Sequence, residues 1–152
     1  MSEKEIIIRL FLSVVLGGLV GLEREVQGRA AGFRTHILVC VGAALIMLTD
    51  IHLVEQYKGM AQVELGRIAA QVISGIGFLG AGTIIRFGGS VRGLTTAASL
   101  WVVAGVGLAA GCGFYTGAVC TTIIVLGVLY LLSQIERGVV GSKRHRKSSS
   151  PE

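Results

Sequence analysis

The chain has 152 residues, of which 52% are hydrophobic and only 15% are charged, and its mean hydropathy is +0.73. A soluble domain carries about 25% charged residues, so this composition excludes an ordinary soluble protein and indicates a membrane protein with several spans. The net charge of +5 would suggest a nucleic-acid partner in a soluble chain. In a membrane protein, basic cytoplasmic loops beside anionic lipid explain it more simply, so we expect the lipid bilayer and no nucleic acid as partner.

The hydrophobic residues form five blocks along the chain, and each block has the length of a short membrane-spanning helix. We predict an all-α membrane protein with five transmembrane helices, at residues 6–22, 36–54, 68–85, 94–110 and 114–132. The first residues lack the positive charge of a signal peptide, so the first block is kept as a mature span. Residues 1–133 then form one transmembrane domain, and residues 134–152 form a basic cytoplasmic tail that we expect to be disordered.

Glycines recur at helical spacing in the first and third blocks, where they predict close packing between helices. They are Gly17, Gly21, Gly75, Gly77, Gly80 and Gly82. Residues 75–80 also match the dinucleotide pattern GxGxxG, which needs a preceding strand and an acidic residue about 20 positions later. The glycines here lie inside an uncharged run and residues 95–105 hold no acid, so we expect no nucleotide and no other cofactor.

The distribution of Lys and Arg predicts the orientation of the five spans. With the C-terminus in the cytoplasm, ten Lys and Arg lie on the cytoplasmic side and four on the outer side. The positive-inside rule therefore places the N-terminus outside, in the periplasm, and the C-terminus inside.

Several segments resemble the transmembrane domain of the MgtC/SapB family, in the same order along the chain. They are residues 22–25 (LERE), 31–40 (AGFRTHILVC), 67–71 (RIAAQ), 74–82 (SGIGFLGAG) and 91–101 (VRGLTTAASLW). The resemblance covers about residues 6–133 and implies a multi-pass protein of the bacterial inner membrane. It also implies a link to growth in low magnesium and to survival inside macrophages, through regulation of the F-type ATP synthase. The longer members carry a cytoplasmic ACT-like domain, which we do not expect here because only the short basic tail follows.

Polar residues gather at the cytoplasmic ends of the first four spans. They are Glu23, Arg24, Glu25, Arg34, Thr35, His36, Arg86, Arg92, Thr95 and Thr96. If the helices pack in sequence order, these side chains converge in one cluster at the interface. The cluster is either a recognition or gating surface, which the resemblance favours, or an ion-pair belt that fixes the helix ends at the lipid headgroups.

Charges within the outer leaflet need partners, because an unpaired charge in hydrocarbon costs a few kcal/mol. Arg9, Asp50 and Arg67 lie there, and we expect Arg9 to pair with Asp50, or Asp50 to meet Arg67. Four further residues with polar groups are expected to be buried inside the bundle, and these are Cys40, Gln71, Ser74 and Trp101.

No catalytic motif is found, since GxSxG, HExxH and a phosphate-binding loop are all missing from the sequence. We therefore expect no enzyme. No metal site is expected either, because no charge lies at the middle of a span and the carboxylates lie near opposite faces. The main hypothesis is a regulator that binds another membrane complex. The alternatives are a transporter or channel for magnesium or another ion, and a self-associating scaffold that forms homo-oligomers.

Overall fold

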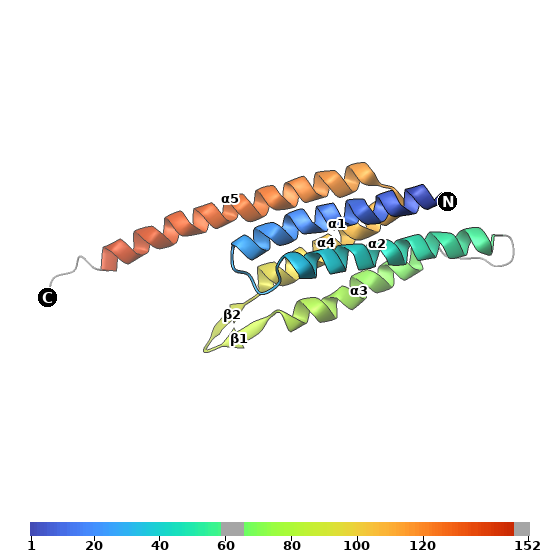
Figure 1. The fold of residues 1–152 in the computed structure, drawn as a ribbon. Helices are drawn as coiled ribbons and strands as arrows, with labels where there is room; N and C mark the ends of the chain where they lie inside the picture. Colours follow the sequence, from blue (N-terminus) through green and yellow to red (C-terminus); the bar gives the residue numbers. More distant parts are fainter. Residues whose placement is uncertain (59–65, 148–152) are drawn as a thin grey trace.

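The fold is an all-helical bundle with one short β-hairpin (Figure 1). The computed structural model describes residues 1–58 and 66–147. Within this part of the chain, the elements are α1 Glu3–Val26, α2 Phe33–Gln56, α3 Arg67–Gly82, β1 Ile85–Phe87, β2 Ser90–Arg92, α4 Leu94–Cys112 and α5 Tyr115–Lys147. The five helices correspond one by one to the five predicted blocks.

Three of the described helices are long and apolar enough to cross a membrane, namely α1, α2 and α4. Helix α3 and the apolar part of α5, Tyr115–Leu131, are shorter apolar helices. Many large apolar side chains point away from the bundle, including Phe11, Leu38 and Ile123. Because water would not tolerate so large an apolar surface, the chain is a membrane protein with its helices in contact with lipid.

Helix α4 lies at the centre of the bundle and contacts each of the other four helices (Figure 1). Its inward side carries Val103, Val106 and Ala110, which pack with Leu16 and Val20 of α1 in the main hydrophobic core. Glycine sets the spacing of α4 from α2. A Cβ at Gly107 would overlap the carbonyl oxygen of Cys40, and one at Gly111 would lie 2.6 Å from the carbonyl oxygen of Ala44. These contacts require a residue without a side chain.

Gly17 and Gly21 of α1 lie directly against α2. A Cβ at Gly17 would lie 2.6 Å from Cys40 Cβ, and one at Gly21 would lie 2.8 Å from Phe33 Cα, so both glycines let α1 approach α2. The contact at Gly80 is less close, since a Cβ placed there would lie 3.5 Å from Ala97 Cβ.

The prediction is wrong for Gly75, Gly77 and Gly82, because a Cβ at any of them would meet no atom within 4 Å. These glycines lie on the side of α3 that faces away from the bundle.

The largest differences from the predicted boundaries lie after α3 and at the end of α5. Residues 86–93 were expected to be a basic loop, but they include most of an antiparallel hairpin whose turn is Gly88-Gly89, with φ of +54° and +86°. Two glycines with positive φ form the tight turn that joins such short strands. Helix α5 continues to Lys147, so the tail expected to be disordered is helical over 134–147, and residues 148–152 lie outside the described part.

Candidate functional site

A cluster of polar side chains is buried where the end of α1 meets the beginnings of α2 and α4. This buried polar cluster consists of the buried residues Arg24, His36, Thr96 and Ser99, together with Glu23, whose side chain is 12% exposed. Arg24 is only 1% exposed and His36 is fully buried. Polar groups this deeply buried are costly unless they are paired, so the contacts within the cluster decide what it can do.

His36 connects α2 to α4 through both of its ring nitrogens. Nδ1 lies 2.9 Å from the carbonyl oxygen of Gly32, and Nε2 lies 3.0 Å from Oγ of Ser99. A carbonyl oxygen only accepts, so Nδ1 carries a proton. The Ser99 hydroxyl has a single proton, which it can donate to Nε2 of a neutral imidazole or to the carbonyl oxygen of Thr96, 2.8 Å away. The direction of the Ser99 hydroxyl is therefore coupled to the protonation state of His36.

Arg24 and Glu23 form an ion pair beside this histidine, between the Arg24 Nε and one oxygen of the Glu23 carboxylate. The other oxygen of the carboxylate, Oε1, is buried and accepts no hydrogen bond within the described part of the chain. Glu25, two positions after Glu23, is exposed and accepts a hydrogen bond of 2.7 Å from the backbone N–H of Phe33.

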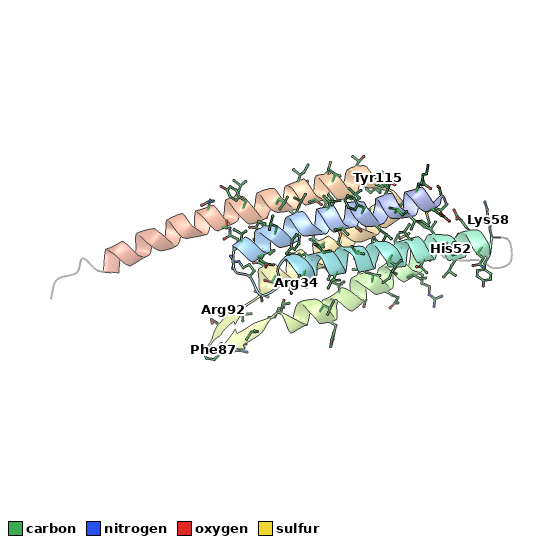
Figure 2. The ribbon with its side chains drawn as sticks, in the orientation of Figure 1. Arg34, His52, Lys58, Phe87, Arg92 and Tyr115 are labelled. Carbon is green, nitrogen blue, oxygen red and sulfur yellow. The ribbon has the colours of Figure 1, made fainter. Side chains whose placement is uncertain are left out.

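The structure divides the predicted cytoplasmic cluster into a buried and an exposed part. Glu23, Arg24, His36 and Thr96 come together as expected, and Ser99 joins them. The remaining members on α2, the hairpin and α4 are exposed, and these are Arg34, Thr35, Arg86, Arg92 and Thr95. Figure 2 places Arg34, Phe87 and Arg92 at one end of the bundle, and His52, Lys58 and Tyr115 at the other.

At this other end, the predicted pair of Arg9 with Asp50 is wrong. The Nη1 of Arg9 donates to the carbonyl oxygen of Gly111 at 2.8 Å, and its Nε donates to the Tyr115 hydroxyl at 3.2 Å. Arg9 thereby covers the end of α4, where the last carbonyl groups have no partner within the helix.

Asp50 is buried, and its Oδ2 lies 3.4 Å from the backbone N–H of Gly66, just before α3. Among the described ion pairs, Asp50 has none with Arg67, whose side chain is exposed. The carboxylate of Asp50 therefore faces the backbone at the start of α3 rather than a cation.

Of the four residues expected to be buried polar groups, only Cys40 is buried. Trp101 is 51% exposed on the outer side of α4, and Gln71 and Ser74 are exposed on α3. For Gln71 and Ser74 the reason is that α3 packs mainly on α2 and α4, so much of its circumference stays outside the bundle.

The outer side of α3 forms a continuous surface of small and polar residues around one aromatic ring. We call it the α3 outward face, and it consists of Gln71, Ser74, Gly75, Phe78 and Gly82. These positions follow the helical spacing i, i+3, i+4, i+7 and i+11, so they lie on one side. Phe78 is 85% exposed, and the Gln71 amide makes no hydrogen bond within the described residues.

Sequence reasoning missed several structural residues. Gly107 and Gly111 have the small-xxx-small spacing that is typical of close helix contacts in membranes, so their role was open to prediction. The contacts of Tyr115 and Ser99 with Arg9 and His36 join residues that are far apart in sequence. No local pattern indicates those contacts. The described residues contain no group of three or more His, Cys, Asp or Glu that could hold a metal ion.

Comparison with known proteins gives a consistent family assignment. A model of the MgtC family matches residues 10–138. A protein of Escherichia coli (strain K12) named putative magnesium transporter YhiD is 38% identical over 143 residues, which is 93% of this chain and 66% of the relative. Protein MgtC of Salmonella typhimurium (strain LT2) is 42% identical over 146 residues, which is 91% of this chain and 60% of the relative.

An uncharacterized protein of Haemophilus influenzae is 40% identical over 144 residues, or 92% of this chain and 58% of the relative. The chain thus spans about three fifths to two thirds of the length of these relatives. No solved structure matches the chain. The family match covers nearly all of the helical bundle, and this chain belongs to the MgtC family.

Proposed function

We propose that this protein is an inner-membrane regulator that acts by binding another membrane protein complex. The observation that carries the proposal is the α3 outward face. Small residues on a membrane helix allow another helix to approach closely, and a polar side chain that faces hydrocarbon favours a partner that can bond to it. A buried amide without a hydrogen bond costs about 1–3 kcal/mol, so covering Gln71 with a partner helix would be favourable.

The proposal includes five membrane spans with the N-terminus in the periplasm and the C-terminus in the cytoplasm. The excess of Lys and Arg at the end that carries Arg34 and Arg92 supports this orientation. The exposed side chain of Arg34 would then lie at the cytoplasmic end of α2.

The F-type ATP synthase is the partner we propose first, together with a role in adaptation to low magnesium and in intracellular survival. The test measures ATP-driven proton pumping by inverted membrane vesicles with and without this protein. We expect the protein to lower pumping and Gly75→Leu to restore it, because the new side chain would fill the α3 outward face.

The matched control is Gly127→Leu on α5, since a Cβ at Gly127, like one at Gly75, meets no atom within 4 Å. The control variant should still lower pumping. If the unaltered protein has no effect on pumping, the ATP synthase is not the target. Capture from native membranes with a cross-linker at Ser74→Cys would then identify another partner, and capture of none would refute the regulator proposal.

Ion transport is the second candidate, and the name of the Escherichia coli relative, putative magnesium transporter, favours it. The purified protein in liposomes loaded with a magnesium-sensitive dye tests this function. Flux no higher than in empty liposomes would reject it.

Self-association is the third candidate, because the α3 outward face could also bind a second copy of the chain. A Ser74→Cys variant without Cys112 and Cys120, the two exposed native cysteines, would then form disulfide-linked dimers in the membrane. Cross-linking to a different protein alone would exclude this candidate.

A further inference from the structure

The β-hairpin between α3 and α4 presents side chains that no other part of the described chain covers. All six residues of β1 and β2 are exposed, and Phe87 reaches 80% and Ile85 60%. The strand register pairs Ile85 with Arg92 and Phe87 with Ser90. Residues that are directly opposite in an antiparallel pair share a face, so one face of the hairpin combines two large apolar side chains with a cation.

The shape of this hairpin is fixed at both of its ends. At the base, Gly93 has a φ of +90° and packs directly against the carbonyl oxygen of Thr83. The Thr83 hydroxyl in turn donates to the carbonyl oxygen of Gly80, at 2.8 Å. At the tip, the Gly88-Gly89 turn closes the strands. A two-stranded hairpin is only marginally stable in water. Because both faces of this hairpin are exposed, we expect another molecule to contact it and stabilise it.

If α3 spans the membrane as proposed above, its length places the hairpin at the border between the hydrocarbon and the lipid headgroups. Helix α3 has 16 residues and is therefore about 24 Å long, whereas the hydrocarbon core of a bilayer is about 30 Å thick. The chain that follows α3 is therefore drawn toward the membrane surface rather than out into the water. Figure 1 shows the hairpin directly beyond the end of α3, beside the first turn of α4.

The chemistry of the hairpin matches that of an anionic membrane surface. Residues 83–94 contain Arg86 and Arg92 and no acidic residue, and arginine binds phosphate through paired hydrogen bonds. Aromatic side chains such as Phe87 favour the border between headgroups and acyl chains when they are attached at this depth. A protein strand is a poorer occupant, because strands of three residues offer few backbone hydrogen bonds for strand addition.

We propose that the hairpin is a membrane-surface anchor, in which Phe87 and Ile85 insert at the interface and Arg86 and Arg92 bind the phosphates of anionic phospholipids. The anchor holds the N-terminus of α4, and thereby the buried polar cluster, at a fixed depth in the bilayer.

The test uses the full chain with Trp101→Phe and Phe87→Trp, which leaves one tryptophan, at the hairpin. The protein is reconstituted in nanodiscs of phosphatidylcholine, with or without phosphatidylglycerol, and its helix content is checked by circular dichroism. We expect blue-shifted emission that is quenched by brominated lipids and protected from iodide, with severalfold stronger lipid quenching in the anionic discs.

Replacing both Arg86→Gln and Arg92→Gln should abolish the difference between the two lipid compositions. The matched control is Arg29→Gln, which removes an exposed charge at the same end of the bundle but outside the hairpin. Emission typical of water, with iodide quenching in both kinds of disc, would overturn the proposal. Shielding that arises only after membrane proteins are added would also overturn it and would identify a protein as the cover. Because the discs contain no other protein, the result does not depend on the proposed regulatory function.

Discussion

The close contact of α2 with α4 predicts that a single methyl group at Gly107 destabilises the whole bundle. In Gly107→Ala, the new Cβ would overlap the carbonyl oxygen of Cys40 and lie 2.9 Å from its carbonyl carbon and 3.0 Å from Ala43 Cβ. Two of these three atoms belong to the backbone, which cannot rotate away as a side chain can. The helices therefore have to separate, and the packing of Cys40 and Val103 along the same interface weakens with them.

The size of the effect follows from a comparison with Gly105→Ala in the same helix. A Cβ at Gly105 meets no atom within 4 Å, so this variant gains the helix preference of Ala over Gly, about 0.5–1 kcal/mol, without a clash. Gly107→Ala gains the same preference but adds the cost of overpacking, about 1–3 kcal/mol. The difference between the two variants isolates the clash, and we expect it to fall in the upper half of that range.

The assay is unfolding in mixed micelles with increasing sodium dodecyl sulfate, followed by circular dichroism. Gly107→Ala should unfold at a clearly lower detergent fraction than the unaltered chain, and Gly105→Ala at the same or a slightly higher fraction. Equal midpoints for the two variants would refute the reasoning, because they would mean that α2 and α4 are not in contact at this point.

Three further predictions concern the two ends of the bundle. A double-mutant cycle of Arg9→Gln with Tyr115→Phe should show a coupling of about 0.5–1.5 kcal/mol in the free energy of unfolding, because their side chains share a hydrogen bond; purely additive effects would contradict that contact. His36→Ala should destabilise the protein by about 1–3 kcal/mol, since it leaves polar groups buried without partners. Adding Ser99→Ala should then cost less than Ser99→Ala costs alone, and equal costs would show that the two residues are not coupled. Cys112, exposed at the turn between α4 and α5, should react in whole spheroplasts with a maleimide that cannot cross the membrane, whereas labelling only in inverted vesicles would reverse the proposed orientation.

The sequence was sufficient to predict the helices because long hydrophobic blocks with few charges form helices in a bilayer. The predicted spans were too short for α1 and α2, since counting apolar residues leaves out polar helix ends such as Glu3 and Gln56. The third span was too long, because its last residues belong to the turn and strand after Gly82. The sequence prediction missed the hairpin, although two short strand-like segments separated by Gly88-Gly89 are a recognised hairpin signal. The basic residues of the segment are also typical of a cytoplasmic loop, which is what was predicted.

The partners of individual side chains could not be predicted in the same way. Arg9 and Asp50 were matched by charge and depth alone, yet the structure gives Arg9 the end of α4 and Asp50 the backbone before α3. The glycines of the third block were predicted to pack against other helices, but three of them face away from the bundle. In a helix that is apolar nearly all round, the sequence does not tell which side faces the bundle. His36 and Thr96 both lie in the buried polar cluster, where Ser99 contacts both of them. Both residues are near the same end of helices that pack on each other, so this proximity could be predicted.

The central position of α4 has a consequence for how the protein is made. Helices α1 and α2 pack on each other and can associate as soon as both have left the ribosome, but α3 and α5 find much of their contact surface on α4. Because α4 is the fourth of the five helices in the chain, the inward side of α3 has no α4 to pack on until residues up to Cys112 have been made. Assembly of the bundle is therefore completed only after α4 has been made. If translation stops before α4, the incomplete bundle exposes unpacked helix surfaces and is a substrate for membrane proteases.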